Sequence, residues 1–126
     1  MDLLLKNVTI VDSKSSLNFQ KRDILIVNGI IKKISKKIKI NDINTIEKEN
    51  LHVSNGWFDS SVCFGEPGYE ERETIAHGLY VAANSGFTHI ALNTNTNPQP
   101  DSRADITFLL EQANLSPVHL YPKARI

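Results

Sequence analysis

The sequence has little cysteine, no net charge and no long apolar run, and each absence excludes a class of protein. Cys63 is the single cysteine, which excludes an internal disulfide framework and a multi-cysteine metal cluster. Fourteen basic residues balance fourteen acidic ones, so net charge favours neither nucleic acid nor an anionic membrane as a partner. No apolar stretch approaches about 18 residues, and no signal region opens the chain. These features predict a soluble, cytoplasmic protein of modest size.

Positive charge is nevertheless concentrated in one place. The segment from Lys32 to Lys39 carries five lysines. They alternate with isoleucines in a strand-like pattern, which favours a solvated strand face and turn over a basic binding patch.

The first 54 residues predict a small antiparallel β unit. Asn28-Gly29 lies between two β-rich runs, and this dipeptide tolerates the positive φ angles of a two-residue hairpin turn. The first aliphatic run predicts a strand that is bulged or broken near Asn7. The predicted strands cover 3–12, 23–27, 30–34 and, more weakly, 45–47.

The remainder, 55–126, alternates strands with helices. Such a β-α-β-α-β order predicts a parallel sheet, either a small open α/β sheet or the opening of a longer fold. The predicted strands cover 57–63, 87–92 and 118–121. The first helix is predicted from Ile75, Leu79, Ala82 and Ala83, with Glu70, Glu71 and Glu73 at its start and Gly86 at its end. The second is predicted to begin at Asp101 or Ser102, with Asp105 completing a cap, and to bury Ile106, Leu109, Leu110 and Ala113.

One motif narrows these alternatives. From Gly56 the chain reads G-W-F-D-S-S-V-C-F-G-E-P-G, which resembles the cyclic amidohydrolase pattern G-[LVI]-[IV]-D-x-H-x-H-[LF]-R-E-P-G. Ser85-Gly86-Phe87-Thr88 and Asn95-Thr96-Asn97-Pro98 are similar to two later family motifs. The sequence thus resembles dihydroorotases over nearly its whole length. The resemblance implies an N-terminal β-sandwich-like subdomain at 1–54 and, at 55–126, the start of a TIM-type (β/α)8 barrel that is incomplete in this chain.

The departures from the family pattern bear on chemistry. The family's two metal-binding histidines, which point to one face of the strand, are replaced by Ser61 and Cys63. A serine hydroxyl is a poor zinc ligand, and one thiolate does not make a site. The family's substrate-binding arginine is replaced by Gly65. Asn95 is the one remaining candidate for a substrate carboxylate contact.

Asp59 keeps its family position, and two roles stay open for it: support of the site, or a bond to neighbouring backbone. The resemblance places the remaining family ligands on later barrel strands, beyond residue 126. We therefore predict no catalytic residue, no metal and no cofactor for this chain, although the family uses zinc. The four histidines match no ligand spacing and are interpreted as scattered structural residues: His52, His77, His89 and His119.

Three hypotheses follow. The first is a non-catalytic, dihydroorotase-like scaffold connected by resemblance to pyrimidine biosynthesis, which forms a homo-oligomer or binds an aspartate transcarbamoylase-type partner. The second is an active hydrolase of dihydroorotate or a related cyclic amide, with an altered metal site completed beyond residue 126. The third is a truncated fragment without a function of its own.

Overall fold

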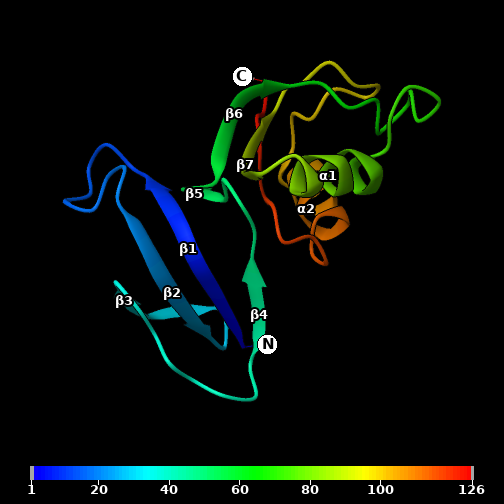
Figure 1. Cartoon of the computed structure of the whole chain (residues 1–126). Coiled ribbons are helices and arrows are strands. Elements are labelled where there is room, and N and C mark those ends of the chain that lie inside the picture. The colour runs from blue at the N-terminus through cyan, green and yellow to red at the C-terminus, as the bar shows by residue number, and fades with distance from the viewer. Residues whose placement is uncertain (1, 126) are drawn as a thin grey trace. The chain divides into compact units, whose positions relative to one another are not determined.

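The computed structural model describes residues 2–125, which form two compact units, one up to Asn55 and one from Gly56 (Figure 1). Among these residues, no helix has both the length and the apolar character needed to cross a lipid bilayer.

The first unit is one five-stranded sheet with the strand order β3-β2-β1-β4, and β5 pairs with a later part of β1. Its strands are β1 (Leu3–Val11), β2 (Lys21–Val27), β3 (Ile30–Ser35), β4 (Asn44–Glu47) and β5 (His52–Ser54). The predicted hairpin is confirmed, because β2 and β3 pair in antiparallel fashion around Asn28 and Gly29, whose φ angles are 51° and 75°.

The prediction of a wholly antiparallel unit is wrong. β4 and β5 both pair with β1 in parallel, each along a different part of its free edge. The nine residues of β1 provide room for both short strands. The sheet is therefore mixed, which is common in larger sheets.

A bulge interrupts β1 at the predicted position. Asn7 has a φ of 52°, and the pairing with β2 shifts register between Leu5 and Val8. The Asn7 backbone N–H donates to Asp23 Oδ1 at 2.9 Å, and the Ile38 N–H donates to Asp23 Oδ2 at 2.8 Å. Asp23 is only 6% exposed. A buried carboxylate is stable when its oxygens accept hydrogen bonds, so Asp23 fixes both the bulge and the segment after β3.

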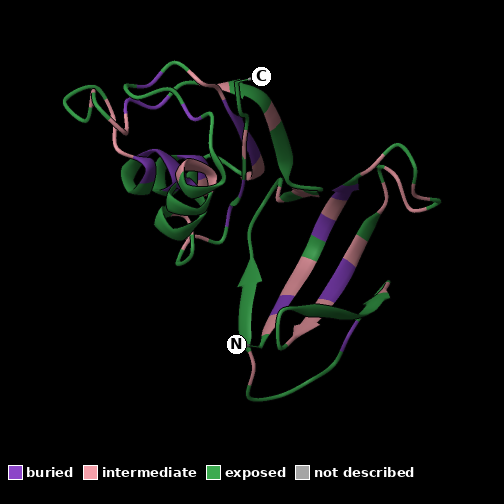
Figure 2. Cartoon of the chain, turned by 180° about the vertical axis from the view of Figure 1, so that it is seen from behind, coloured by how far each residue is buried: buried purple, intermediate pink, exposed green. Residues whose placement is uncertain are grey.

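The core of the first unit lies along β1 and β2. Val8, Ile10 and Ile24 are buried. Figure 2 shows buried segments on both strands. β3 is exposed almost throughout, and Lys32 and Lys33 lie on it, which confirms the solvated strand face for these two lysines. Lys36, Lys37 and Lys39 follow the strand.

The second unit is a three-stranded parallel sheet in the order β6-β7-β8, with two helices between its strands. Its elements are β6 (Trp57–Val62), α1 (Ile75–Asn84), β7 (Phe87–Leu92), α2 (Arg103–Gln112) and β8 (His119–Pro122). The predicted β-α-β-α-β order is confirmed. Both helices lie on the same side of the sheet (Figure 1).

The core of this unit lies between the helices and that side of the sheet. Its buried members are Phe64, Ile75, Leu79, Ala82, Ile90, Leu92, Leu109, Val118 and Leu120. Ile106 and Ala113 pack against them, as predicted. The prediction that Leu110 is buried is wrong, since it is 46% exposed. Residues next to each other on a helix point about 100° apart, so Leu109 and Leu110 cannot share one narrow buried stripe.

The two helices begin differently. α2 has the predicted capping box: the Ser102 hydroxyl accepts from the Asp105 N–H, and Asp105 Oδ2 accepts from the Ser102 N–H. α1 begins later than expected, with Thr74 as its N-cap, so its first turn contains no acidic residue. Glu70, Glu71 and Glu73 therefore precede the helix. The Thr74 hydroxyl accepts from the His77 N–H at 3.2 Å. Glu66, nine residues upstream of Ile75, adds a second cap, because its Oε2 accepts from the Ile75 N–H at 2.8 Å.

Candidate functional site

The candidate site lies where the three parallel strands of the second unit end. Parallel strands bring their carboxyl ends to one edge of a sheet, the edge at which α/β folds place their active sites. Ser61 lies near the end of β6, and Cys63 follows that strand directly. Asn93 directly follows β7, and Lys123 directly follows β8.

Hydrogen bonds join these four side chains, which we call the strand-end cluster (Ser61, Cys63, Asn93 and Lys123). The Asn93 amide nitrogen donates to Ser61 Oγ at 3.0 Å and to Cys63 Sγ at 3.4 Å. Lys123 Nζ donates to the Asn93 amide oxygen at 2.7 Å and to the Ser60 carbonyl at 2.9 Å. Both amide N–H donors of Asn93 are thereby used, and the cluster connects all three strand ends.

The residues of the cluster do not fit the zinc ion that the family resemblance implies. Ser61 Oγ and Cys63 Sγ each accept one hydrogen bond from the Asn93 amide, and a neutral serine hydroxyl beside a single cysteine is a poor ligand pair for zinc. The ammonium group of Lys123 donates to the oxygen of the same amide and places a positive charge beside the cluster. A positive charge there opposes the binding of a zinc cation, which requires neutral imidazole or anionic ligands. Among residues 2–125, no group of three or more His, Cys, Asp and Glu side chains is placed to hold a metal ion.

Asp59 bonds to backbone rather than to any side chain of the cluster. Its Oδ1 accepts from the Ser61 N–H at 3.0 Å. The pairing of β6 with β7 shifts register between Asp59 and Val62, so Asp59 holds an irregular stretch of β6. Of the two roles considered for this residue, the contact observed is the one with neighbouring backbone.

Gly65 occupies a position that excludes a side chain. It is buried, its N–H donates to the Glu73 carbonyl at 2.8 Å, and its carbonyl accepts from the Tyr69 N–H at 2.9 Å. A Cβ atom here would lie 1.9 Å from the Tyr69 carbonyl oxygen. At the position where the resemblance places an arginine, a turn closes tightly around glycine.

The Glu66-Pro67-Gly68 turn packs against the loop after β7. The Asn97 N–H donates to the Pro67 carbonyl at 2.9 Å, and a Cβ on Gly68 would lie 2.0 Å from the Asn97 oxygen. The Gly68 N–H donates to Glu70, and this backbone hydrogen bond lowers the pKa of the Glu70 carboxyl. Since Glu66 also caps α1, the interpretation of this motif as a turn that shapes the start of the helix is confirmed.

Asn95 lies on the same loop and is exposed. Its neighbour Thr96 is buried, and the Thr96 hydroxyl donates to the Pro98 carbonyl at 2.9 Å. The loop amide that the structure brings to Ser61 and Cys63 is Asn93, not Asn95.

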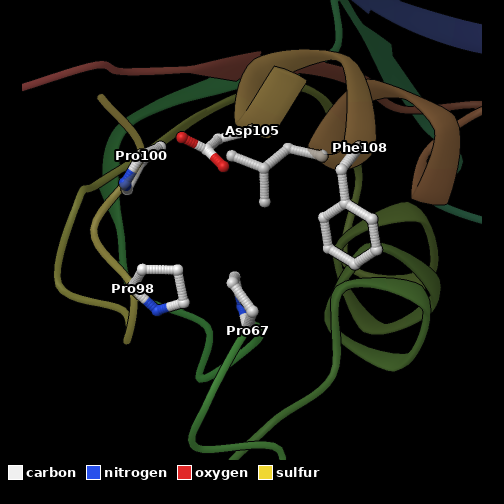
Figure 3. A pocket seen from close by; sticks show the side chains of 6 residues that line it. Pro67, Pro98, Pro100, Asp105 and Phe108 are labelled. Carbon is white, nitrogen blue, oxygen red and sulfur yellow. The ribbon is translucent and has the colours of Figure 1, made fainter. Parts of the chain in front are cut away.

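A separate pocket of about 250 Å³ lies between this loop, the turn and α2 (Figure 3). It is lined by Pro67, Pro98, Pro100, Asp105, Phe108 and Leu109. The Asp105 carboxylate at its wall already serves the α2 cap, and hydrogen bonds from the Ser102 hydroxyl and from backbone N–H groups lower its pKa. None of the predicted site residues lines this pocket.

The sequence analysis did not identify Asn93 and Lys123 as site residues. It also interpreted His89 and His119 as scattered residues.

These two histidines lie opposite each other on β7 and β8, with ring centroids 5.0 Å apart. Tyr121 stacks on His89 at 5.9 Å. The register between β7 and β8 was not predictable from the sequence, so the histidine pair could not be predicted. The strand-end cluster had one signal, since Asn93 and Lys123 each lie just after a predicted strand.

Comparison with known proteins agrees with this architecture. A family model described as "Dihydro-orotase-like" matches residues 52–125. The chain is 37% identical over 113 residues to a dihydroorotase of Ruminiclostridium cellulolyticum, covering 90% of this chain and 26% of that protein. It is 39% identical over 109 residues to a dihydroorotase of Fusobacterium nucleatum, covering 86% of this chain and 25% of that protein.

Solved structures show the same fold. An L-hydantoinase (dihydropyrimidinase) from Arthrobacter aurescens superposes with a TM-score of 0.77 and 22% identity, over 98% of this chain and 27% of that one. A crystal structure of a dihydroorotase superposes with a TM-score of 0.68 and 15% identity, over 98% of this chain and 31% of that one.

The fold is thus that of the amidohydrolases, an N-terminal β unit followed by the first β-α-β-α-β units of a TIM-type barrel. Within that class, the chain belongs to the dihydro-orotase-like family. It spans about a quarter of the length of the curated relatives it matches.

Proposed function

We propose that this protein is a non-catalytic member of the dihydro-orotase-like family. The proposal rests on one observation, the hydrogen bond from Lys123 to Asn93. The amide nitrogen of Asn93 in turn donates hydrogen bonds to Ser61 and Cys63. These two residues stand where the resemblance places the histidine ligands of the first barrel strand. A hydrogen-bonded cluster with its own positive charge takes the place of a metal site.

The chemistry of the family supports the same proposal. Hydrolysis of a cyclic amide by this family needs a metal-activated hydroxide. The cluster offers a hydroxyl, a thiol, an amide and an ammonium group, and none of these replaces two imidazoles as zinc ligands. Gly65 also removes the arginine that resemblance assigns to the substrate carboxylate, and Asn95 is left as an exposed loop amide.

We further propose a role in association, in the context of pyrimidine biosynthesis. Phe58, with 59% of its surface exposed, meets Tyr121, with 51% exposed, edge to face at 6.4 Å. Exposed aromatic rings favour association. A second copy or an aspartate transcarbamoylase-type protein, in the cytoplasm, is the partner class to test.

The test is a dihydroorotate assay in both directions with added zinc, on the whole protein as it is naturally produced. We expect no turnover above the uncatalysed rate for the natural sequence. Zinc-dependent turnover of the natural sequence would contradict the proposal and favour the hydrolase with an altered site. A chain that shows no cooperative melting would instead favour the truncated fragment.

A further inference from the structure

A second pocket, remote in sequence from the strand-end cluster, lies entirely within the first unit. It has a volume of about 520 Å³, within the range of small-molecule sites. It is lined by residues of β1, by Glu47 of β4 and by the segment that joins β3 to β4, the cyan coil in Figure 1. The pocket-lining lysines are Lys6, Lys36, Lys37 and Lys39.

The buried Asp23 carboxylate holds the walls of this pocket in place. One oxygen accepts from the Asn7 N–H in the β1 bulge, and the other accepts from the Ile38 N–H in the lysine-bearing segment. Ile38 itself is buried. The side chains of Lys37 and Lys39 therefore flank an anchored residue rather than a free loop.

Positive charge dominates the pocket. Asp23 is buried and both of its oxygens accept hydrogen bonds, while Glu47 Oε2 lies 3.9 Å from Lys6 Nζ. The pocket is thus lined by two carboxylates and four lysines, and three of these lysines are exposed: Lys36, Lys37 and Lys39. The whole chain is neutral, but residues 1–55 contain ten lysines and arginines against six acidic residues, a surplus of four positive charges.

We propose that this pocket binds a small, multiply charged phosphate-type anion. A concave site lined with charge of one sign concentrates counter-ions of the other. Lysine ammonium groups act as compact point charges that bind phosphate oxygens from several directions. Among the residues that the structure describes, no aromatic side chain lines the pocket, so it offers no surface on which the bases of a single-stranded nucleic acid would stack.

Isothermal titration of the whole chain with inorganic tripolyphosphate at low salt tests this proposal. We expect one site per chain whose affinity falls as salt is added, because partly exposed charges are screened. The variant Lys36→Gln/Lys37→Gln/Lys39→Gln should bind about tenfold more weakly or not at all.

The matched control removes three lysines of the same unit that do not line the pocket. Lys14→Gln/Lys32→Gln/Lys33→Gln has the same net charge and should bind within about twofold of the natural sequence. Thermal melts of both variants check that they fold, which is expected because all six lysines are exposed.

Absence of binding by the natural sequence, or equal weakening in the two variants, would overturn the proposal. The second outcome would mean that net charge alone attracts the anion. The proposal does not depend on the state of the strand-end cluster, because none of its residues lies in the first unit.

Discussion

Lys123 donates a 2.7 Å hydrogen bond to the side-chain oxygen of Asn93, and this bond joins the ends of β8 and β7. The amide nitrogen of Asn93 extends the connection to Ser61 and Cys63 on β6. A metal ion held by ligands from several strands would tie strand ends together in a comparable way. Here the same edge of the sheet is joined by neutral polar groups and one ammonium group.

Replacement of Lys123 by methionine should destabilise the second unit by about 1 kcal/mol, because two charge-assisted hydrogen bonds are lost at an exposed position. Chemical denaturation of the natural and variant chains measures the difference. Arg103→Met, which removes an exposed cation from α2, is the control and should change stability by less than about 0.5 kcal/mol. Equal effects in the two variants would show that the contacts of Lys123 are not stabilising.

Restoring the family's arginine at Gly65 should damage the fold rather than recover a substrate contact. Its Cβ would lie 1.9 Å from the Tyr69 carbonyl oxygen, so the turn must move, at a cost of about 1–3 kcal/mol or more. Gly65→Ala should already lower the melting temperature. Gly86→Ala serves as a comparison rather than a neutral control, since no atom lies within 4 Å of its Cβ and its cost comes from the positive φ of 89° alone. A Gly65→Arg chain as stable as the natural one would refute this account of the turn.

Gly78→Ala should destabilise the protein, although alanine is the better helix former. In an open helix this exchange would add about 0.5–1 kcal/mol of stability. Here the new Cβ would lie 2.3 Å from Cε1 of the buried Phe64 ring. We expect a net loss of about 1–3 kcal/mol in denaturant unfolding. In a Phe64→Leu background the loss should shrink or reverse, and a loss of the same size there would mean that the ring is not the cause.

The α2 cap should contribute stability that depends on pH. Hydrogen bonds from the Ser102 hydroxyl and from the N–H groups of Ser102 and Asp101 lower the pKa of Asp105 below its ordinary 3.8. The folded state thus favours the ionised form, so the stabilisation is present above about 3.8 and is lost as the pH falls through the lower folded-state value. At pH 7 the melting temperature of the natural chain should be higher than that of Asp105→Asn. In acid the two melting temperatures should converge. A difference in melting temperature that grows as the pH falls would contradict this account of the Asp105 cap.

Several elements could be predicted because their signals are local. The Asn28-Gly29 turn and the Ser102–Asp105 capping box depend on residues within a few positions of each other. The two apolar helix stripes and the order of strands depend on periodicity, which a sequence displays directly. The motif around Glu66 also indicated its own turn.

Other features depend on contacts between distant residues. The parallel pairing of β4 and β5 with β1 follows from how the chain returns after β3, and short strands carry no signal of direction. Lys123 meets Ser60 across 63 positions, and Asn93 meets Ser61 across 32. The acidic residues before α1 suggested an earlier start than the one observed, because Thr74 is the N-cap and Glu66 adds its cap from outside the helix.

The metal content of the purified protein tests the central claim most directly. After incubation with zinc and dialysis, elemental analysis should find well below one zinc per chain, because Ser61 and Cys63 are bonded to Asn93 and lie beside the ammonium group of Lys123. Lys123→Leu alone should not change this result, since leucine adds no ligand. About one zinc per chain, lost on Cys63→Ser, would contradict the account and show that the strand-end cluster is a metal site.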